Sequence, residues 1–264
     1  MPTVSIITPL YRPEPEHLTE TIRGVTEQRL PGGWSIEWVI QEDGPDTTRE
    51  DLLADVPAVS YQANGSHLGV AATRNIALSR ASGELVQVLD QDDYLLPNAV
   101  ATLIPHFQNP AIHWAISQAD DLNENGTRTS WPSALPHGEI SPGVANSDAI
   151  EREGNWSIHC AGLMIRTAVL RALGGWVASW GDDDIVMFAG LSEITKGYND
   201  PSVTWLYRQH AGQLHRTPES QARSARGRQV ALDRVAAIRA VGATLTTHSF
   251  VEEPTPAAGP AQKD

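Results

Sequence analysis

The chain has 264 residues, 41% of them hydrophobic, and a formal net charge of −13 at pH 7. This length suits one large α/β domain with or without a modest extension, and the acidity argues against general nucleic-acid binding and against docking on anionic lipid. Cys160 is the only cysteine, which excludes an internal disulfide, and the absence of a transmembrane-length window or a signal peptide before the first strand pattern predicts a cytoplasmic protein.

Apolar patterns in the first half alternate between strand and helix. Short β-type runs predict strands at 4–10, 36–40, 59–61, 85–89 and 112–117. Helical spacing predicts helices around 18–25, 47–54 and 69–81, and a further one with Pro97 as its first residue. Pro105 should kink or shorten that last helix. The alternation predicts a Rossmann-like, mostly parallel sheet flanked by helices.

The second half is less regular. Residues 123–155 are rich in Gly, Pro, Ser and Asn, so we expect loops and short strands over one end of the sheet. Apolar runs predict strands at 160–165 and 203–207, a short helix at 168–173, a helix that begins near residues 182–184, and a long helix at 219–241. Beyond about Glu252 the composition predicts disorder.

Three carboxylates follow the strand at 85–89. Asp90 and Asp92 should point the same way, because side chains alternate along a strand, and Asp93 lies just beyond. Ligands of open α/β sheets bind at the carboxyl ends of strands, and hard carboxylate oxygens suit Mg²⁺ or Mn²⁺ that arrive with substrate phosphates. The alternative is an acidic turn before a helix, where Asp also serves as a cap.

Further motifs accompany the acidic one in a defined order. They are Val4-Ser-Ile-Ile-Thr-Pro-Leu-Tyr11, Glu42-Asp43-Gly44, Asn64 with Gly69 and Arg74-Asn75, Gly83-Glu84 before Asp90-Gln91-Asp92-Asp93, Trp180-Gly181-Asp182-Asp183-Asp184, and Tyr207-Arg208-Gln209-His210. Their order and spacing resemble the family-two glycosyltransferases of the GT-A fold, an inverting, metal-dependent group. The match covers about residues 3–216, and it departs from the family in Glu42 for the usual Asp and in Pro45 for Ser.

The resemblance implies the organisation of the chain. It predicts a GT-A domain at 1–216, with a nucleotide-binding half at 1–120 and an acceptor-binding half at 121–216. Beyond the match, the residue pattern and composition predict a C-terminal helical extension at 217–245 and a disordered tail at 246–264.

The resemblance also assigns residues to the nucleotide. The turn with Pro9, Tyr11 and Arg12 would pair with a uracil- or thymine-like base through its backbone, with the Tyr11 ring against the base. Asp43 would accept a hydrogen bond from the base or the ribose. A tight proline turn, and a simple turn residue before Gly44, are the corresponding structural alternatives. Arg74 would lie near the diphosphate, or else on a helix surface or beside an acid.

In the acidic Asp-x-Asp (DXD) motif, the resemblance gives Asp93 the direct bond to Mn²⁺ or Mg²⁺. Asp92 would bind the ribose or reach the metal through water, and Asp90 would support the cluster. His210 would complete the metal sphere or close a loop over the diphosphate, with Arg208 or Arg216 beside it. His215 is expected to face solvent.

The acids at 182–184 have a separate expected role. An inverting transfer needs a carboxylate that takes the proton of the acceptor hydroxyl. The motif register favours Asp183 as this base, with Asp182 as its rival and with Asp184 as a helix cap. His159 would line the sugar pocket, although a structural histidine is an equal alternative.

The expected function is transfer of a sugar from a nucleotide-diphosphate donor, UDP or dTDP preferred, to a hydroxyl acceptor that is soluble. A sugar-nucleotide nucleotidyltransferase is an alternative, but it would show a Gly-rich phosphate loop where this chain has Pro9-Leu-Tyr-Arg-Pro-Glu. A non-catalytic carbohydrate-binding relative is the other alternative, and the intact acids at both motifs argue against it.

Overall fold

The computed structural model describes residues 1–131, 133–213 and 216–245, and a ten-stranded sheet runs through them. The strands follow the order β3-β2-β1-β4-β9-β6-β10-β5, with β7 beside β6 and β8 beside β10. Their bounds are β1 Thr3–Leu10, β2 Ser35–Glu42, β3 Val59–Ala63, β4 Leu85–Val88, β5 Tyr94–Leu95, β6 Ile112–Leu122, β7 Arg128–Ser130, β8 Gly138–Ile140, β9 Leu163–Arg166 and β10 Lys196–Arg208.

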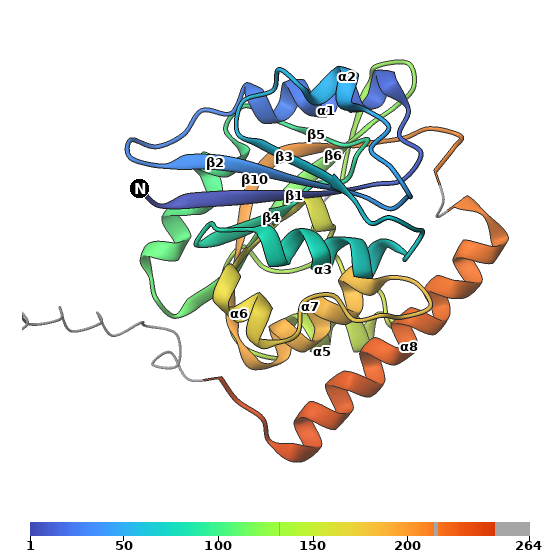
Figure 1. Ribbon diagram of the computed structural model, residues 1–264. Coiled ribbons are helices and arrows are strands. Elements are labelled where there is room, and N and C mark those ends of the chain that lie inside the picture. Colours follow the sequence, from blue (N-terminus) through green and yellow to red (C-terminus); the bar gives the residue numbers. More distant parts are fainter. Residues whose placement is uncertain (132, 214–215, 246–264) are drawn as a thin grey trace, which may run out of the picture.

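Helices cover both faces of the sheet (Figure 1). The helix α1 and the short α2 lie above the sheet in this view, and α3, α5, α6 and α7 lie below it. The bounds are α1 Pro15–Thr26, α2 Glu50–Leu53, α3 Val70–Arg80, α4 Ala99–Leu103, α5 Val144–Glu151, α6 Thr167–Ala172, α7 Asp183–Ile194 and α8 Pro218–Val241, with 3₁₀ turns at Ile104–Gln108 and Cys160–Gly162.

The strand order confirms the predicted α/β architecture. β3, β2, β1 and β4 are parallel neighbours, and the long β6–β10 ladder is also parallel. Antiparallel pairs enter through β9, which lies between β4 and β6, and through the short strands at the edge. Val86 and Val88 of β4 pack in the core on one face, and Leu85 and Leu89 pack on the other, as expected for a strand buried on both faces.

Several local predictions were wrong in detail. Pro97 precedes the cap of α4, Asn98, and is not the first helical residue. α4 ends at Leu103 and continues as a 3₁₀ turn that contains Pro105, so the expected shortening is confirmed. Residues 160–162 form a 3₁₀ turn and not a strand. The helix α5 lies within the segment expected to be loops and strands, and β5 was not predicted.

Glu37 on β2 connects to β1 and to the turn before β4. Its carboxylate accepts hydrogen bonds from Ser5 on β1 and from Ser82 and Gly83 before β4. Burial by itself would raise the pKa of Glu37, but these hydrogen bonds together lower it below its usual value of 4.5.

Because its pKa is lowered in the folded state, the stability that Glu37 contributes is complete above the usual pKa and is lost as the pH falls through the lowered value. We expect Glu37→Gln to lower the free energy of unfolding by about 1–2 kcal/mol at pH 7, since hydrogen bonds to a charged group are replaced by neutral ones. Urea unfolding at pH 7 and at pH 3 checks this: the gap between variant and wild type should narrow at pH 3. A constant gap would show that charge is not involved.

The long helix α8 lies outside the sheet and packs along α7 (Figure 1). The Thr217 side chain caps its first turn by accepting a hydrogen bond from the Ser220 N–H, and Gly242 ends it in a left-handed conformation. The predicted extension therefore begins at the expected place, whereas the expected tail at 246–264 and His215 lie outside the described residues. In the described part of the chain, no helix is long and apolar enough to cross a membrane.

Candidate active site

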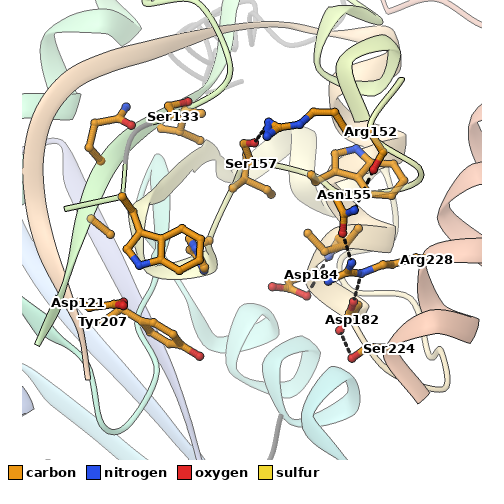
Figure 2. A pocket seen from close by; sticks show the side chains of 18 of the residues that line it. Asp121, Ser133, Arg152, Asn155, Ser157, Asp182, Asp184, Tyr207, Ser224 and Arg228 are labelled. Carbon is orange, nitrogen blue, oxygen red and sulfur yellow. Dashed lines mark hydrogen bonds and ion pairs between the residues drawn. The ribbon is translucent and has the colours of Figure 1, made fainter. Parts of the chain in front are cut away.

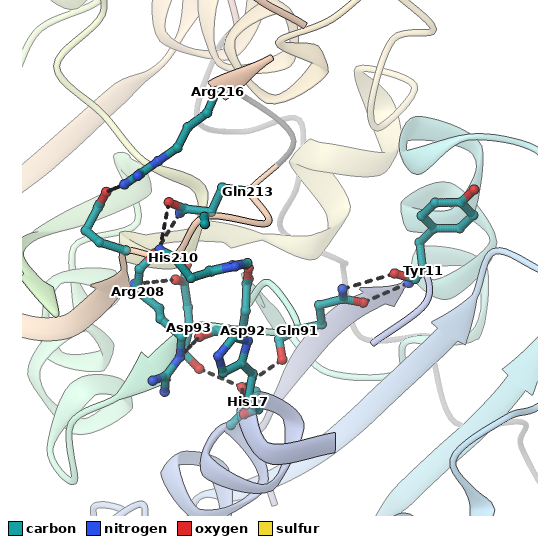
Figure 3. A network of polar contacts seen from close by, with 12 residues as sticks. Tyr11, His17, Gln91, Asp92, Asp93, Arg208, His210, Gln213 and Arg216 are labelled. Atoms are coloured by element: carbon teal, nitrogen blue, oxygen red, sulfur yellow. Dashed lines mark hydrogen bonds and ion pairs between the residues drawn. The ribbon is translucent and has the colours of Figure 1, made fainter. Parts of the chain in front are cut away.

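The loops that follow β1 and β4 are joined at the carboxyl edge of the sheet. The Gln91 side chain accepts a hydrogen bond from the Tyr11 N–H (2.8 Å) and donates one to the Tyr11 carbonyl (3.1 Å) (Figure 3). The Tyr11 ring lies 4.9 Å from the His67 ring, and the Arg12 guanidinium lies over it at 5.1 Å. Pro9 remains within β1, so the turn begins after the strand rather than at the proline.

Asp43 is a buried anchor for the loop after β3. Its Oδ1 accepts hydrogen bonds from the Leu68 N–H (2.6 Å) and the Asn64 amide (3.1 Å). Its Oδ2 accepts one from the Gly69 N–H (3.0 Å) and lies 2.8 Å from His67 Nδ1. Each oxygen thus has two partners, and the predicted bond to a base would require one of them to leave. This arrangement favours the structural alternative for Asp43.

Arg74 joins the two acidic motifs. It projects from α3 and is buried, and its two terminal nitrogens lie 2.8 Å from Asp90 Oδ1 and 2.9 Å from Asp183 Oδ2. Of the alternatives weighed from sequence, the structure therefore makes Arg74 the partner of acids, and it excludes a place on the helix surface. The acids after β4 and the acids at the start of α7 form one site through this guanidinium.

The three acids after β4 differ sharply in exposure. The side chains of Asp90 and Asp92 are 37% and 25% exposed, whereas Asp93 is 1% exposed. Asp93 Oδ1 accepts a hydrogen bond from the Arg208 N–H (3.1 Å). Burial first, and then the charges of Asp92 and Asp90, raise the pKa of Asp93 well above that of an ordinary carboxyl group. A buried, hydrogen-bonded carboxyl is a poor candidate for the direct metal ligand that the resemblance implied.

Asp92 and His210 face each other instead. His210 Nε2 lies 3.0 Å from Asp92 Oδ2, and the His17 ring lies 4.8 Å from the His210 ring (Figure 3). Arg208 braces the same loop, because its Nε donates to the Asp92 carbonyl (2.8 Å) and its guanidinium pairs with Glu20. Arg208 thus has partners within the protein through Nε and Nη2, and its role at the diphosphate stays a prediction.

The donor set fits a hard divalent cation that is completed by phosphates. In the described residues, no group of three or more His, Cys, Asp or Glu side chains is arranged to hold a metal by itself. Mg²⁺ and similar ions usually take only one or two carboxylates from the protein and fill the remaining positions with phosphate and water. Asp92 can supply one such carboxylate, and the His210 ring beside it can supply a nitrogen ligand.

The three acids at the start of α7 point to three different partners. Asp182 occupies the cap position without a capping hydrogen bond from its side chain, and it binds Ser224 and Arg228 of α8. Asp183 is buried against Arg74, and Asp184 lines a cavity. The expected cap at Asp184 is therefore wrong, because the cap position belongs to Asp182. Asp182 is also a weaker rival for the base, since a cation and a hydroxyl already hold both of its oxygens.

Burial raises the pKa of Asp183 above its usual value, and the neighbouring Arg74 charge opposes this rise. A carboxylate with a raised pKa accepts a proton more readily than an ordinary one. The environment of Asp183 thus favours proton acceptance, and the adjacent Asp182 and Asp184 line a cavity.

A cavity of about 1070 Å³ opens between β6, β10, the 152–159 segment, α7 and α8 (Figure 2). Aromatic rings form one wall: His159 lies 5.3 Å from Tyr207, 5.6 Å from Trp205 and 5.9 Å from the exposed Trp131. Polar groups complete the lining, among them Asp121, Asp184, Arg152, Asn155, Arg228 and Gln209. His159, predicted near a sugar pocket, lies in this wall.

Sequence reasoning missed several residues of the site. Gln91 lies inside the acidic motif, and only the fold reveals that it binds the Tyr11 backbone. Ser224 and Arg228 lie on the C-terminal helix, for which the motifs predict no role. The one available signal was Gly227, a glycine inside a helix, which often marks a close contact.

The model of the family described as glycosyl transferase family 2 matches residues 5–174. An N-acetylglucosaminyltransferase of Bradyrhizobium elkanii is 25% identical over 134 residues, which are 48% of this chain and 71% of the relative. The putative colanic acid biosynthesis glycosyl transferase WcaA of Escherichia coli K12 is 34% identical over 86 residues, 33% of this chain and 30% of the relative.

Solved structures share the fold. TarS 1-349 of S. aureus, in a crystal structure with UDP-GlcNAc, superposes with a TM-score of 0.63 at 17% identity, over 80% of this chain and 60% of that one. A crystal structure of the same TarS fragment with UDP gives a TM-score of 0.63 at 18% identity, over 93% of this chain and 68% of that one. The chain thus spans only part of TarS 1-349 and less than a third of WcaA.

Proposed function

We propose that this chain, which belongs to glycosyl transferase family 2, moves a sugar from a nucleotide-diphosphate donor to an acceptor hydroxyl with inversion at the anomeric carbon. One observation carries the proposal: Arg74 bridges Asp90 beside the donor-side acids and Asp183 beside the acceptor-side cavity. A donor bound at one end and an acceptor bound at the other would meet at this ion-pair network. Measurement of UDP release from UDP-GlcNAc in the presence of Mn²⁺ tests the activity.

The donor is proposed to carry a pyrimidine nucleotide, with UDP preferred. The Tyr11 ring borders the edge of the sheet where ligands of such folds bind, and Gln91 fixes the Tyr11 backbone. The relative named as an N-acetylglucosaminyltransferase and the TarS complexes with UDP and UDP-GlcNAc support this choice. Asp43 then acts by holding the 64–69 loop that supports the Tyr11 ring through His67.

Asp92 and His210 are proposed to hold Mn²⁺ or Mg²⁺. When bound, such an ion neutralises the diphosphate and makes the nucleotide a better leaving group. Asp93 keeps a structural role, because it receives the Arg208 N–H and thereby fixes the loop that presents Asp92.

Asp183 is proposed to accept the acceptor proton. The acceptor oxygen forms a bond to the anomeric carbon while the bond from that carbon to the phosphate oxygen breaks. The hydroxyl proton passes to the Asp183 carboxylate, and the electron pair leaves with the nucleoside diphosphate. The Arg74 charge opposes the rise in the pKa of Asp183 and so favours the ionised carboxylate, and a nearby negative charge favours an oxocarbenium-like transition state. Asp184, which lines the cavity, replaces Asp182 as the rival base.

The acceptor is proposed to bind in the cavity beside Asp184. The aromatic wall of Trp131, His159 and Tyr207 can cover a sugar-like face, and polar groups opposite can bind hydroxyls. A volume of about 1070 Å³ is large enough for a saccharide or a comparable polyhydroxy compound.

Two substitutions separate the metal ligand from its structural neighbour. UDP at about a hundred times its dissociation constant should stabilise the wild type by roughly 2.7 kcal/mol with Mn²⁺, and much less with EDTA. We expect Asp92→Asn to lose the metal-dependent part, because a carboxylate ligand is removed. Asp93→Asn should keep it, because Asn still accepts the Arg208 N–H.

Thermal unfolding of the wild type and both variants with UDP, with Mn²⁺ and with EDTA measures the difference. If Asp93→Asn lost the metal-dependent stabilisation and Asp92→Asn kept it, Asp93 would be the metal ligand. Equal stabilisation by UDP in Mn²⁺ and in EDTA would contradict a metal-linked donor site.

A further inference from the structure

The helix α8 contacts the turn from which the proposed base projects. Asp182, Asp183 and Asp184 are consecutive, yet Asp182 binds side chains of α8 and Asp183 pairs with Arg74 of α3. Asp184 lines the cavity, as Asp182 does (Figure 2). Asp183 and Asp184 are the first two residues of α7, in which successive side chains turn by about 100°, and Asp182 is the cap residue just before them. Whatever fixes the backbone of Asp182 therefore also fixes where α7 begins and how Asp183 and Asp184 are aimed.

Asp182 has an unfavourable backbone conformation. Its φ and ψ are 50° and 41°, in the left-handed region that is uncommon for residues other than glycine, although Asp and Asn adopt it more often than most. The Asp182 side chain does not compensate by capping α7, because it makes no hydrogen bond to the first turn. Such a conformation persists only where the surrounding structure imposes it.

Two side chains of α8 supply that constraint. Ser224 Oγ donates a hydrogen bond to Asp182 Oδ1 (2.6 Å), and Arg228 Nε donates to Asp182 Oδ2 (3.0 Å) (Figure 2). Arg228 also donates to the Asn155 side chain in the wall of the cavity. Both carboxylate oxygens of Asp182 are thus fixed from the same helix.

The backbones of the turn and of α8 touch at two glycines. A Cβ atom on Gly227 would lie 1.9 Å from the Gly181 carbonyl oxygen, and one on Gly181 would lie 2.9 Å from the Arg223 carbonyl carbon. No larger residue fits at either position without movement of the backbone. This close approach brings α8 near enough for Ser224 and Arg228 to bind the Asp182 carboxylate.

We propose that Ser224 and Arg228 are positioning residues: they hold Asp182 in its left-handed conformation and so aim Asp183 at Arg74 and Asp184 into the cavity. The proposal rests on the proposed function, in which Asp183 takes the proton. It assigns to α8 a direct part in transfer, beyond the stability that any packed helix supplies.

The test compares two ion pairs made by α8, one with Asp182 just before α7 and one with Glu193 near the end of α7. S224A/R228Q removes the contacts to Asp182. R239Q removes the pair between Arg239 Nε and Glu193 Oε1 (2.8 Å) at the other end of α7. The two arginine side chains are equally exposed, at 42%, so R239Q is a matched control. UDP release from UDP-GlcNAc with Mn²⁺ and water as the acceptor is measured, so that contacts between Arg228 and a larger acceptor do not contribute.

We expect kcat of S224A/R228Q to fall by about tenfold or more, because misplacement of a reacting group by about 1 Å can cost a hundredfold. KM for UDP-GlcNAc should stay the same, since the donor-side acids are untouched. The single variant R228K should keep more of the wild-type kcat than S224A/R228Q does, because Lys keeps a cation near Asp182. R239Q should keep wild-type kcat while its melting temperature falls.

A second readout does not need activity. The carboxyl carbon of Asp183, followed by ¹³C NMR, should titrate at a higher pH in S224A/R228Q than in the wild type, because the carboxylate moves away from Arg74. It should not change in R239Q. If the wild type releases no UDP, the proposed function fails while this titration still tests the positioning role.

Wild-type kcat and an unchanged Asp183 titration in S224A/R228Q would overturn the proposal. The proposal would also be overturned if kcat fell as far in R239Q as in S224A/R228Q and if, in both variants, the fall followed the loss of melting temperature. If the double variant does not fold, S224A alone carries both measurements, because it removes a single hydroxyl group.

Discussion

Asp183→Asn should abolish most sugar transfer while donor binding stays intact. Asn keeps the size of Asp and can still pack beside Arg74, but it cannot take a proton from the acceptor. Loss of a general base typically costs about 10²- to 10⁴-fold in rate. We therefore expect kcat to fall within that range, with UDP binding in Mn²⁺ close to that of the wild type. Steady-state UDP release and calorimetric titration of UDP measure the two quantities.

The same change at the neighbouring acids gives the controls. Asp184→Asn tests the rival base that lines the cavity, and Asp182→Asn tests the residue held by α8. Asp182→Asn should lower kcat less than Asp183→Asn, because Asn tolerates the left-handed conformation and keeps the hydrogen bond from Ser224. Near-normal turnover in Asp183→Asn with collapse in Asp184→Asn would move the base to Asp184.

Arg74→Met should have the largest effect on stability. The substitution leaves Asp90 and the buried Asp183 without the cation that lies within 3 Å of each. Removal of one partner from a buried ion pair costs about 3–5 kcal/mol. The partial exposure of Asp90 places the expected loss in the lower part of that range. Urea unfolding at pH 7 measures it.

The same variant should change the pH dependence of transfer. Arg74 lowers the pKa of Asp183 against the effect of burial, so its removal raises the pKa of Asp183 further. A base with a higher pKa is protonated at a higher pH, and the acidic limb of the kcat profile should shift upward. Arg80→Met is the control, because Arg80 lies on the same helix but binds only carbonyls of Ile40 and Ser60. If the acidic limb did not shift in Arg74→Met, the titration of Asp183 would not determine the pH dependence of kcat.

The first half of the chain could be predicted because the local periodicity of its apolar residues indicates which strands and helices bury them. The pattern of β4 indicates a strand buried on both faces, and its valines and leucines occupy both cores. The second half was harder because tertiary contacts decide its structure. β5 has two residues and exists only through its pairing with β10. α5 follows Gly143 in a segment of turn-forming residues, and buried Asn146, which donates to the Ala189 carbonyl, ties it to α7.

The site shows the same division. The order of the motifs in the sequence predicted the family and the fold, and the comparisons with known proteins confirmed both. The burial of Asp93 was not predictable from sequence, because its carboxylate contacts a distant segment, with a hydrogen bond from the Arg208 N–H, 115 residues away. Strand alternation does not explain these exposures, because β4 ends at Val88 and Asp90 and Asp92 lie beyond it. The two carboxylates have different partners, Arg74 and His210, so the expectation that they point the same way was wrong. The link from Arg74 to Asp183 spans 109 residues and required the fold.

Inversion at the anomeric carbon is tested most directly by ¹H NMR of UDP-α-GlcNAc turnover in Mn²⁺, recorded before the free sugar anomers equilibrate. Attack by water with one displacement predicts that β-GlcNAc appears first, together with UDP, and that both are lost in EDTA and in Asp183→Asn. Initial release of α-GlcNAc would contradict a single displacement.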